Sequence, residues 1–374
     1  MTRLIHITPE LPPTVGGIAD YTAILTRRLV EVSDGAVEPV LIRAGWTPDA
    51  PAPEANFPTV DLSGTCADEA LAAALREAAQ GSDRVAVLLE YSGYGYAKRG
   101  APLWLLRGLQ QACGRGGLPL VTMFHELYAS GPPWTSAFWV SPVQRYVAAQ
   151  LAQLSGAVVT NRVKSATWLR RYVSEEASVR VQPVFSNVGE PEQVPSWNER
   201  AAYAVVFGGT GKNALYSQYG KHVARVLDML KVPELVDVGP KPDESLLKFI
   251  GHDRVTVKGF LPIQEIQNYL KNAKAGFVCR NPEAFTKSGS LAAYAAYGIP
   301  TFIGLRDSMN ASQLWKEGVH YHRIKTIENK DDRSSYLNFS MGVGKNAYEL
   351  YKASAHSAKA GDVFYQIIGE ACAN

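Results

Sequence analysis

The sequence predicts an α/β protein made of two Rossmann-like, doubly wound parallel-sheet domains that face each other across a cleft. The chain has 374 residues, whereas single hydrophobic cores stop growing near ~250–300 residues. Short apolar runs alternate with amphipathic runs in both halves, which is typical of parallel sheets covered by helices. Hydrophobic residues form 46% and charged residues 20% of the chain. These proportions indicate a folded globular protein rather than a disordered one.

Composition and charge exclude several classes of function. The formal net charge is +3, which is small for a protein that binds nucleic acid through many phosphate contacts, so we expect no nucleic-acid partner. No apolar run approaches the ~18 residues of a membrane-spanning helix, and the first residues lack a secretory signal pattern. The four cysteines are scattered, without the spacing of metal ligands or a disulfide framework. We therefore expect a cytoplasmic protein with no metal site.

A shift in basic residues marks the expected domain boundary. The chain has 2 Lys and 14 Arg before residue 186, and 15 Lys and 7 Arg after it. The shift coincides with a polar stretch at 187–198 that is rich in Pro and Glu. We therefore place the domains at 1–186 and 199–374. Two explanations of the shift stay open: surface drift, or two domains with separate histories, as in a chimera.

The first domain alternates strands and helices. Strands are expected at 3–8, 39–44, 84–91, 120–125, 157–160 and 179–184, where β-branched and apolar residues lie between turn residues. Helices are expected at 17–32, 67–79, 102–113, 142–154 and 164–173. In the first of these, Ile18, Tyr21, Leu25 and Leu29 recur at helical spacing.

The second domain follows the same pattern. Strands are expected at 202–207, 235–238, 255–259, 275–279 and 300–303, and helices at 221–230, 245–250, 263–272 and 290–297. Residues 345–368 predict one or two further helices, which we expect to pack back on the first domain. In open α/β sheets, ligands bind at the carboxyl ends of the strands, so candidate residues are sought there.

A glycine loop follows the first strand. The sequence PPTVGG at 12–17 precedes a helix, and Gly16 and Gly17 would let a ligand approach the backbone closely. The N–H groups at the start of that helix suit a phosphate or a sugar. The alternative is a tight strand-to-helix turn, which also favours glycine.

His125 and Glu126 end a predicted strand of the first domain. An imidazole at this edge could hydrogen-bond a sugar hydroxyl or a diphosphate oxygen, and the carboxylate could orient it. The alternative is a solvated strand end. The other histidines considered, His6, His222 and His252, have no comparable placement.

A second anion pocket is predicted before the helix at 290–297. Lys287 precedes Ser288, Gly289 and Ser290, and a serine here can cap the helix. A lysine at a helix start opposes the helix dipole unless an anion lies between them, which favours a diphosphate site over an ordinary capped helix. The glycine loop FGGTGK at 207–212, with Gly209 and Lys212, could cradle another part of the same diphosphate, although it is not a Walker P-loop.

An aromatic and basic stretch lies at 91–104 and contains Lys98 and Arg99. It could line an acceptor groove or touch lipid headgroups. An aromatic loop that caps the core is an equal alternative.

Taken together, these motifs resemble the GT-B-fold glycosyltransferases, and among them the retaining glycosyltransferase family four, which includes bacterial mannosyl- and glucosyltransferases of polysaccharide assembly. The resemblance covers nearly the whole chain. Its carriers are PPTVGGIADYTAILTRRL at 12–29, YGYAKRGAPLWL at 94–105, MFHELYA at 123–129, VVFGGTG at 205–211, VTVKGFLPIQEIQNYLKNAKAGFV at 255–278 and AAYAAYGIPTFI at 292–303.

The resemblance implies roles for individual residues. Gly16 and Gly17 would lie against the donor diphosphate, and His125 against the transferred sugar or phosphate. Lys212 would be a phosphate ligand, and Phe260 would lie beside the nucleotide base. The backbone of 288–290 would bind the distal phosphate. The first domain would then hold the acceptor, and the second the nucleotide sugar.

The sequence departs from the family pattern at three positions. The family has two glutamates eight residues apart, and these positions fall at Phe285 and Ala293 here. Glu283 would replace the first after a two-residue loop shift. A family arginine after the FGG-like strand is Gly209.

The resemblance predicts transfer of a sugar from a nucleoside diphosphate to an acceptor hydroxyl in bacterial polysaccharide or glycan synthesis, with retention and without a metal or other cofactor. Lys212, Lys287 and the helix start would stabilise the leaving diphosphate. The acceptor would be a glycan or lipid-linked, with a peripheral contact to the inner face of the membrane. The alternatives are a non-catalytic member that binds a nucleotide sugar or a partner, and an epimerase or phosphorylase of the same fold.

Overall fold

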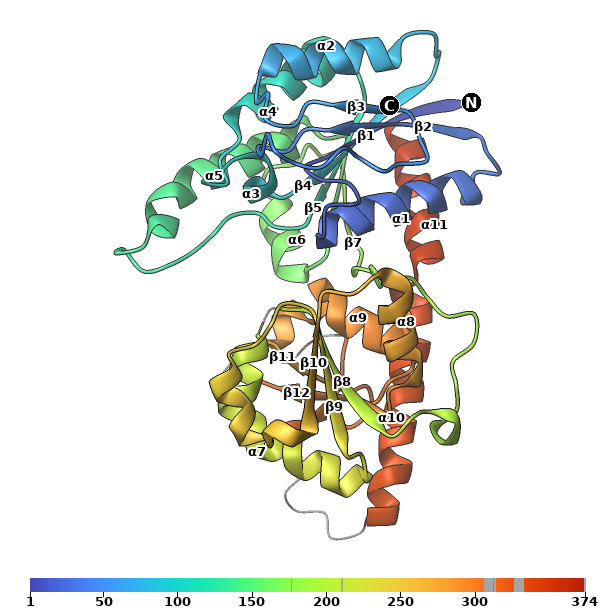
Figure 1. The fold of residues 1–374 in the computed structure, drawn as a ribbon. Coiled ribbons are helices and arrows are strands. Elements are labelled where there is room, and N and C mark those ends of the chain that lie inside the picture. The colour runs from blue at the N-terminus through green and yellow to red at the C-terminus, as the bar shows by residue number, and fades with distance from the viewer. Residues whose placement is uncertain (176, 210, 306–311, 313, 326–332, 373–374) are drawn as a thin grey trace. The chain divides into compact units, whose positions relative to one another are not determined.

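The computed structural model describes residues 1–175, 177–209, 211–305, 312, 314–325 and 333–372 (Figure 1). The chain divides into two compact units. The first unit contains Met1–Pro183 and Ser357–Asn374, and the second contains Val184–His356. Each unit holds a parallel sheet flanked by helices, which confirms the predicted fold class. Among the described residues, no helix combines the length and apolar character needed to cross a bilayer.

The first unit has a seven-stranded parallel sheet in the order β3-β2-β1-β4-β5-β6-β7. Its strands are β1 (Thr2–Thr8), β2 (Val37–Arg43), β3 (Thr59–Asp61), β4 (Val85–Tyr91), β5 (Leu120–Phe124), β6 (Ala157–Thr160) and β7 (Ser178–Val181). Its helices are α1 (Gly17–Val32), α2 (Asp68–Ala79), α3 (Gly93–Tyr96), α4 (Leu103–Leu109), α5 (Ser136–Leu154), α6 (Val163–Leu169) and α11 (Ser357–Ala371). The strand order reverses between β1 and β4, which is the switch point where doubly wound sheets bind ligands.

Alternation along the strands assigns side chains to the two faces of this sheet. Ile5, Ile7, Val87 and Leu89 belong to one buried apolar cluster with residues of α2, α4 and α5. The residues between them point to the other face, where His6 contacts Thr26 of α1. The last helix, α11, packs beside α1.

The second unit has a six-stranded parallel sheet in the order β10-β9-β8-β11-β12-β13. Its strands are β8 (Tyr203–Phe207), β9 (Glu234–Val238), β10 (Val255–Gly259), β11 (Ala275–Cys279), β12 (Thr301–Gly304) and β13 (His322–Arg323). Its helices are α7 (Lys212–Leu230), α8 (Ile263–Asn272), α9 (Gly289–Ala296) and α10 (Arg333–Ser354). Short 3-10 turns lie at Trp197–Glu199, Glu244–Phe249, His252–Arg254 and Pro282–Lys287.

The structure departs from the predicted elements in ways that have physical causes. The short strands β3 and β13 were not predicted because two or three partly exposed residues give no apolar pattern. Helix α5 begins six residues before Pro142, which the sequence reading took as the helix start. Helix α7 begins at Lys212 and runs through Gly220. The predicted helix at 245–250 is a 3-10 turn.

Gly220 is the contact point between α7 and the turn Glu244–Phe249. A Cβ at this glycine would lie 2.5 Å from Cβ of Phe249. We expect Gly220→Leu to lower the free energy of unfolding by about 1–3 kcal/mol, because the extra side chain overpacks this contact. Urea denaturation measures the change.

The matched control is Gly342→Ala in the interior of α10, where an added Cβ meets nothing within 4 Å. That variant should gain about 0.5–1 kcal/mol from reduced backbone freedom in the unfolded chain. Equal stability of Gly220→Leu and the wild type would contradict the tight contact between α7 and the turn.

Candidate functional site

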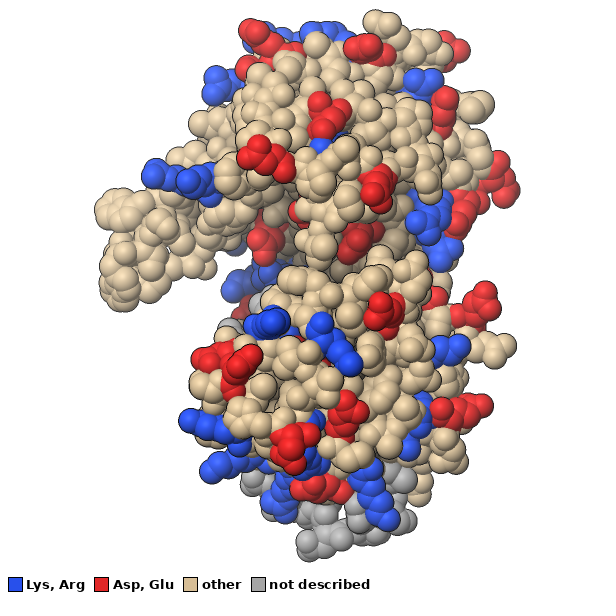
Figure 2. Space-filling view, in the orientation of Figure 1, with Lys and Arg blue, Asp and Glu red and all other residues tan. Residues whose placement is uncertain are grey.

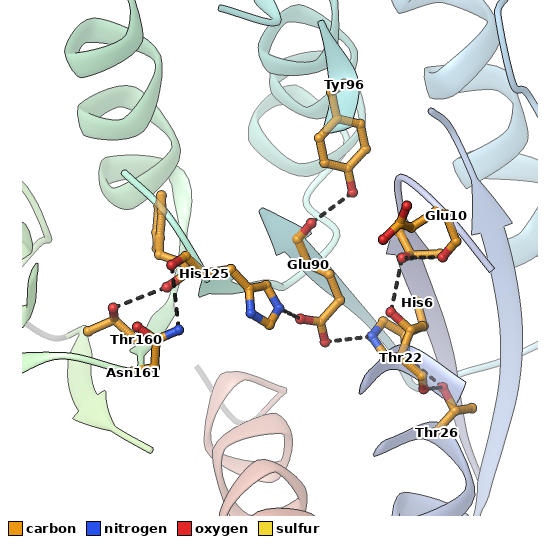
Figure 3. Close-up of polar contacts among 11 residues, drawn as sticks. His6, Glu10, Thr22, Thr26, Glu90, Tyr96, His125, Thr160 and Asn161 are labelled. Atoms are coloured by element: carbon orange, nitrogen blue, oxygen red, sulfur yellow. Dashed lines mark hydrogen bonds and ion pairs between the residues drawn. The ribbon is translucent and has the colours of Figure 1, made fainter. Parts of the chain in front are cut away.

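The candidate site of the first unit is a buried chain of polar groups at the switch point of its sheet. Glu90 lies near the end of β4 and is completely buried. Its Oε1 accepts a hydrogen bond from Nε2 of His6 at 2.9 Å, and its Oε2 accepts one from Nε2 of His125 at 2.6 Å (Figure 3). One carboxylate in β4 therefore links β1 to the residue that directly follows β5.

The two histidines keep Glu90 ionised. Burial by itself raises the pKa of this carboxyl group, but hydrogen bonds from His125 and His6, and attraction to both rings, outweigh burial and lower the pKa. The carboxylate in turn fixes both rings as Nε2–H donors. An unpaired charge at this depth would cost several kcal/mol, so the three side chains form one unit.

His125 is the member of this chain that reaches the surface. Its side chain is 10% exposed, and its ring lies edge-on to that of Tyr21, with centroids 4.9 Å apart. Its backbone N–H donates to the carbonyl of Tyr91 at 3.0 Å, which fixes the strand end. Since Nε2 is held by Glu90, Nδ1 is the ring nitrogen that can accept a hydrogen bond from a ligand hydroxyl.

Threonines of α1 anchor the other end of the chain. Nδ1 of His6 lies 2.8 Å from Oγ1 of Thr26, which donates to the carbonyl of Thr22 at 2.7 Å. Thr22 Oγ1 lies 2.9 Å from Oγ1 of Thr8, which donates to the carbonyl of Glu10 at 2.9 Å (Figure 3). Thr22 and Thr26 are four residues apart and therefore share the buried face of α1. The network locks α1 against β1.

The glycine loop lies next to this network, and a protein carboxylate occupies it. Glu10 accepts hydrogen bonds from the backbone N–H groups of Ile18 and Ala19 at the start of α1. A Cβ on Gly16 would lie 2.1 Å from Oε1 of Glu10, so a side chain at this position would displace the Glu10 carboxylate. Gly17 is exposed, with open space at its Cβ position. A phosphate at this helix start would meet Glu10 first.

Partial burial makes the Glu10 carboxylate easier to protonate. Burial raises its pKa, and the N–H groups of Ala19 and Ile18 and the nearby His125 offset only part of that rise. A group with a raised pKa becomes neutral sooner as the pH falls. The negative charge at the start of α1 is therefore weakened in mild acid.

The corresponding edge of the second unit is lined by glycine. Gly208 follows β8 and has φ at +91°, and a Cβ there would lie 2.6 Å from Oγ of Ser290. A Cβ on Gly209 would lie 3.0 Å from Cγ of Pro240. Ser288 caps α9 as predicted, because its Oγ accepts a hydrogen bond from N of Leu291 at 3.3 Å. The structure thus brings the loop after β8 and the start of α9 together; Thr210 of this loop lies outside the described residues.

Lys212 lies in the same region, but its ammonium group points into the unit. Its Nζ donates to Oδ1 of Asp237 at 2.6 Å and to the carbonyl of Pro240 at 2.8 Å, and it lies 3.5 Å from the carbonyl of Val238. Asp237 also accepts a hydrogen bond from Tyr216. Burial raises the pKa of Asp237, and Lys212 and Tyr216 offset part of the rise. Lys212 therefore ties the start of α7 to β9 and the loop that follows it, and a contact with phosphate stays a prediction.

The remaining predicted residues lie nearer the surface. Glu126 and Glu283 are exposed, Lys287 and Gly289 are half-buried, and Phe260 is 67% exposed after β10.

The positions where the family resemblance places glutamates are filled by core residues. Phe285 is 2% exposed and packs edge-on against Trp315 and Tyr321. Ala293 is completely buried in α9. Neither position offers a carboxylate to a ligand.

Sequence reasoning missed three of the residues described above. His6 was set aside as poorly placed, which is wrong, because it shares Glu90 with His125. Glu10 and Glu90 were not considered. The available signal was Glu90 itself, the one charged residue in the strand VAVLLEY, since buried parallel strands are apolar throughout and an exception requires partners.

Comparisons with known proteins identify the fold class of this chain. No protein-family model matches the sequence, and no curated protein matches it. Several solved structures match over almost their full length. Sucrose-phosphate synthase from Thermosynechococcus elongatus is 16% identical, with a TM-score of 0.59 over 99% of this chain and 100% of that one. AviGT4, a glycosyltransferase of avilamycin A biosynthesis, is 14% identical, with a TM-score of 0.55 over 100% and 98%.

A third match is an α-glucosyltransferase in complex with UDP-glucose and DNA that contains an abasic site. It is 11% identical, with a TM-score of 0.61 over 99% of both chains. These likenesses show that the chain has the GT-B fold. Because one of these structures holds DNA, the fold by itself does not exclude a nucleic-acid partner.

Glu90→Gln tests the buried chain of the first unit. The amide can accept from one histidine only, so we expect the free energy of unfolding at pH 7 to fall by about 3 kcal/mol or more. Since folding lowers the pKa of Glu90, its stabilisation is present above the unfolded value of about 4.3 and is lost as the pH falls through the folded pKa. The difference between wild type and variant should therefore shrink below about pH 4.

Urea denaturation at several pH values measures both effects, with the exposed Glu126→Gln as the control that should match the wild type. A Glu90→Gln variant with wild-type stability at pH 7 would contradict the proposed coupling of the three side chains.

Proposed function

We propose that the protein is a glycosyltransferase that moves a sugar from a nucleoside diphosphate to an acceptor hydroxyl. The observation that carries this proposal is His125, which is held by a buried carboxylate at the switch point of a GT-B-fold unit. A fixed Nε2–H tautomer leaves Nδ1 to accept a hydrogen bond from a hydroxyl of the transferred sugar. A solvated strand end would need no buried carboxylate behind it.

The second unit supplies groups for the departing diphosphate. The start of α9 presents first-turn N–H groups of Gly289 and Ser290, and the side chain of Lys287 precedes them. As the bond to the sugar breaks, negative charge grows on the diphosphate, and these donors would stabilise it. Lys212 would act indirectly by holding the loop that contains Gly209.

The finer assignments rest on the family resemblance and on the neighbours. We propose a uridine diphosphate sugar as donor, because the α-glucosyltransferase is in complex with UDP-glucose. Phe260 would lie beside the base and Glu283 near the ribose. We further propose retention of configuration and a role in bacterial polysaccharide or glycan synthesis.

A second candidate is a non-catalytic protein that binds a nucleotide sugar or a partner. Two observations favour it. The family's glutamate positions are taken by the buried core residues Phe285 and Ala293, and the carboxylate of Glu10 already interacts with backbone N–H groups at the start of α1. Both features would weaken binding of a nucleotide-sugar donor, but neither changes the position of His125.

A thermal-shift titration with UDP, GDP, ADP and their sugar nucleotides tests donor binding first. A ligand at about 100 times its dissociation constant stabilises the folded protein by about 2.7 kcal/mol, which raises the melting temperature by a few degrees. A shift with one base, followed by turnover of the matching sugar nucleotide with a glycan acceptor, would establish the enzyme. A shift without turnover would favour a non-catalytic protein that binds a nucleotide sugar. No shift with any nucleotide would contradict the glycosyltransferase and favour a non-catalytic protein that binds a partner.

His125→Ala should lower kcat/KM for transfer by about tenfold, the upper range for one hydrogen bond to a substrate. Glu90→Gln should act through His125, so the double variant should lose little more than either single variant. Initial rates of sugar transfer measure the effect, with the exposed His252→Ala as control. Additive losses would show that Glu90 does not work through His125.

Glu10→Gln removes the charge that occupies the start of α1. If the donor diphosphate binds against Gly16 and Gly17, this variant should bind the nucleotide diphosphate several-fold more tightly at pH 7. Because folding raises the pKa of Glu10, wild-type affinity should rise as the pH falls toward 5, whereas the affinity of the variant should change less. Calorimetric titration at pH 7 and pH 5 distinguishes the two, and weaker binding by Glu10→Gln would place the diphosphate elsewhere.

A further inference from the structure

An apolar arm projects from the first unit where β5 leads into α5. It comprises residues 128–146, the connecting loop and the first three turns of α5 (Figure 1). No charged residue occurs from 127 to 144. Figure 2 shows the projection as uncharged surface, with basic side chains where it joins the body of the unit.

The arm exposes large apolar side chains that its own unit does not cover. Trp134 is 84% exposed and Trp139 is 72% exposed. Tyr146, Phe138 and Val143 are also exposed, at 54%, 43% and 39%. The inner face of α5 is already buried through Gln144, Val147, Ala148 and Leu151. An outer face of a surface helix is normally polar, so this face is built for an apolar environment.

The stretch of sequence that contains the arm is strongly basic. Residues 91–174 contain nine Lys and Arg and a single acidic residue, Glu126, so this stretch carries +8 while the whole chain carries +3. Lys98 and Arg99 are exposed, and their loop is tied to the arm because Nε2 of Gln144 donates to the carbonyl of Arg99 at 2.8 Å. Arg145 lies over the ring of Tyr128 at the base of the arm, 4.4 Å from its centroid.

We propose that this arm docks on the surface of an anionic lipid bilayer. Tryptophan and tyrosine side chains favour the interface between headgroups and acyl chains, and nearby lysine and arginine bind acidic headgroups. Two such signals together give stable attachment of a protein that does not span the membrane. A nucleic acid would instead need several basic side chains on the projecting surface itself, where residues 127–144 have none. The docking is independent of the transfer reaction.

Flotation of the full chain with vesicles tests the proposal. The vesicles contain phosphatidylcholine alone or mixed with phosphatidylglycerol. Wild-type protein should float with the anionic vesicles. The double variant Trp134→Ser, Trp139→Ser should lose at least tenfold in partition coefficient. The variant Lys98→Gln, Arg99→Gln should lose about fivefold for each charge. Tyr365→Ser, which removes an exposed aromatic side chain of α11, is the matched control and should float like the wild type.

Three outcomes would overturn the proposal. One is wild-type protein that stays with neither kind of vesicle. Another is equal flotation of the Trp134→Ser, Trp139→Ser variant and the wild type. The third is binding of a different partner to the arm. It would be seen as dimer formation in light scattering, or as binding to a short DNA duplex, and the tryptophan substitutions would abolish either one. Far-ultraviolet circular dichroism of each variant confirms that it is folded.

Discussion

One buried carboxylate organises the first unit. Glu90 is bonded to a histidine on each side, so the register of β1, β4 and β5 is tied to a polar contact as well as to apolar packing. Removing the carboxylate would leave two imidazoles without their partner inside a closed core. The contact therefore stabilises the unit only when Glu90 and both histidines are present. The same contact presents His125 at the strand end with a defined tautomer. Stability and the candidate chemistry of this unit therefore depend on the same atoms.

Close backbone approach is the second constraint, and it acts in both units. At Gly16 the missing side chain makes room for Glu10, and at Gly208 it makes room for Ser290. At Gly16 the glycine precedes α1 and the polar side chain comes from the loop after β1, whereas at Gly208 the glycine follows β8 and the polar side chain comes from the start of α9. The two edges differ in charge, however. The start of α1 already holds a carboxylate, whereas the start of α9 is capped by a neutral serine. An incoming diphosphate thus meets less repulsion at the start of α9.

The sequence predicted the fold better than the site. Alternating apolar runs located the long buried strands because burial on both faces leaves a clear pattern. Gly16, Ser288 and His125 could be proposed as site residues because strand ends and helix starts have local signatures. The role of Glu90 could not be read in the same way, since it depends on partners 84 and 35 residues away in the chain. Lys212 shows the opposite problem. A lysine after a glycine loop suggests a phosphate ligand, but Asp237, 25 residues further on, determines where its ammonium group points.

The apolar arm and the candidate site share one segment of chain. His125 directly follows β5, and the arm begins three residues later. Gln144, only 1% exposed, ties the two ends of the arm together by accepting from N of Ala129 at 2.7 Å, and it ties the arm to the basic loop by donating to the carbonyl of Arg99. The position of the arm is therefore coupled to the segment that follows His125 and to the basic loop that contains Arg99. In a protein that uses a soluble donor and an acceptor held at a surface, such a link would place His125 at a set distance from that surface. The exposed tryptophans would then fix the unit on that surface, and the buried carboxylate would fix the imidazole of His125 within the unit.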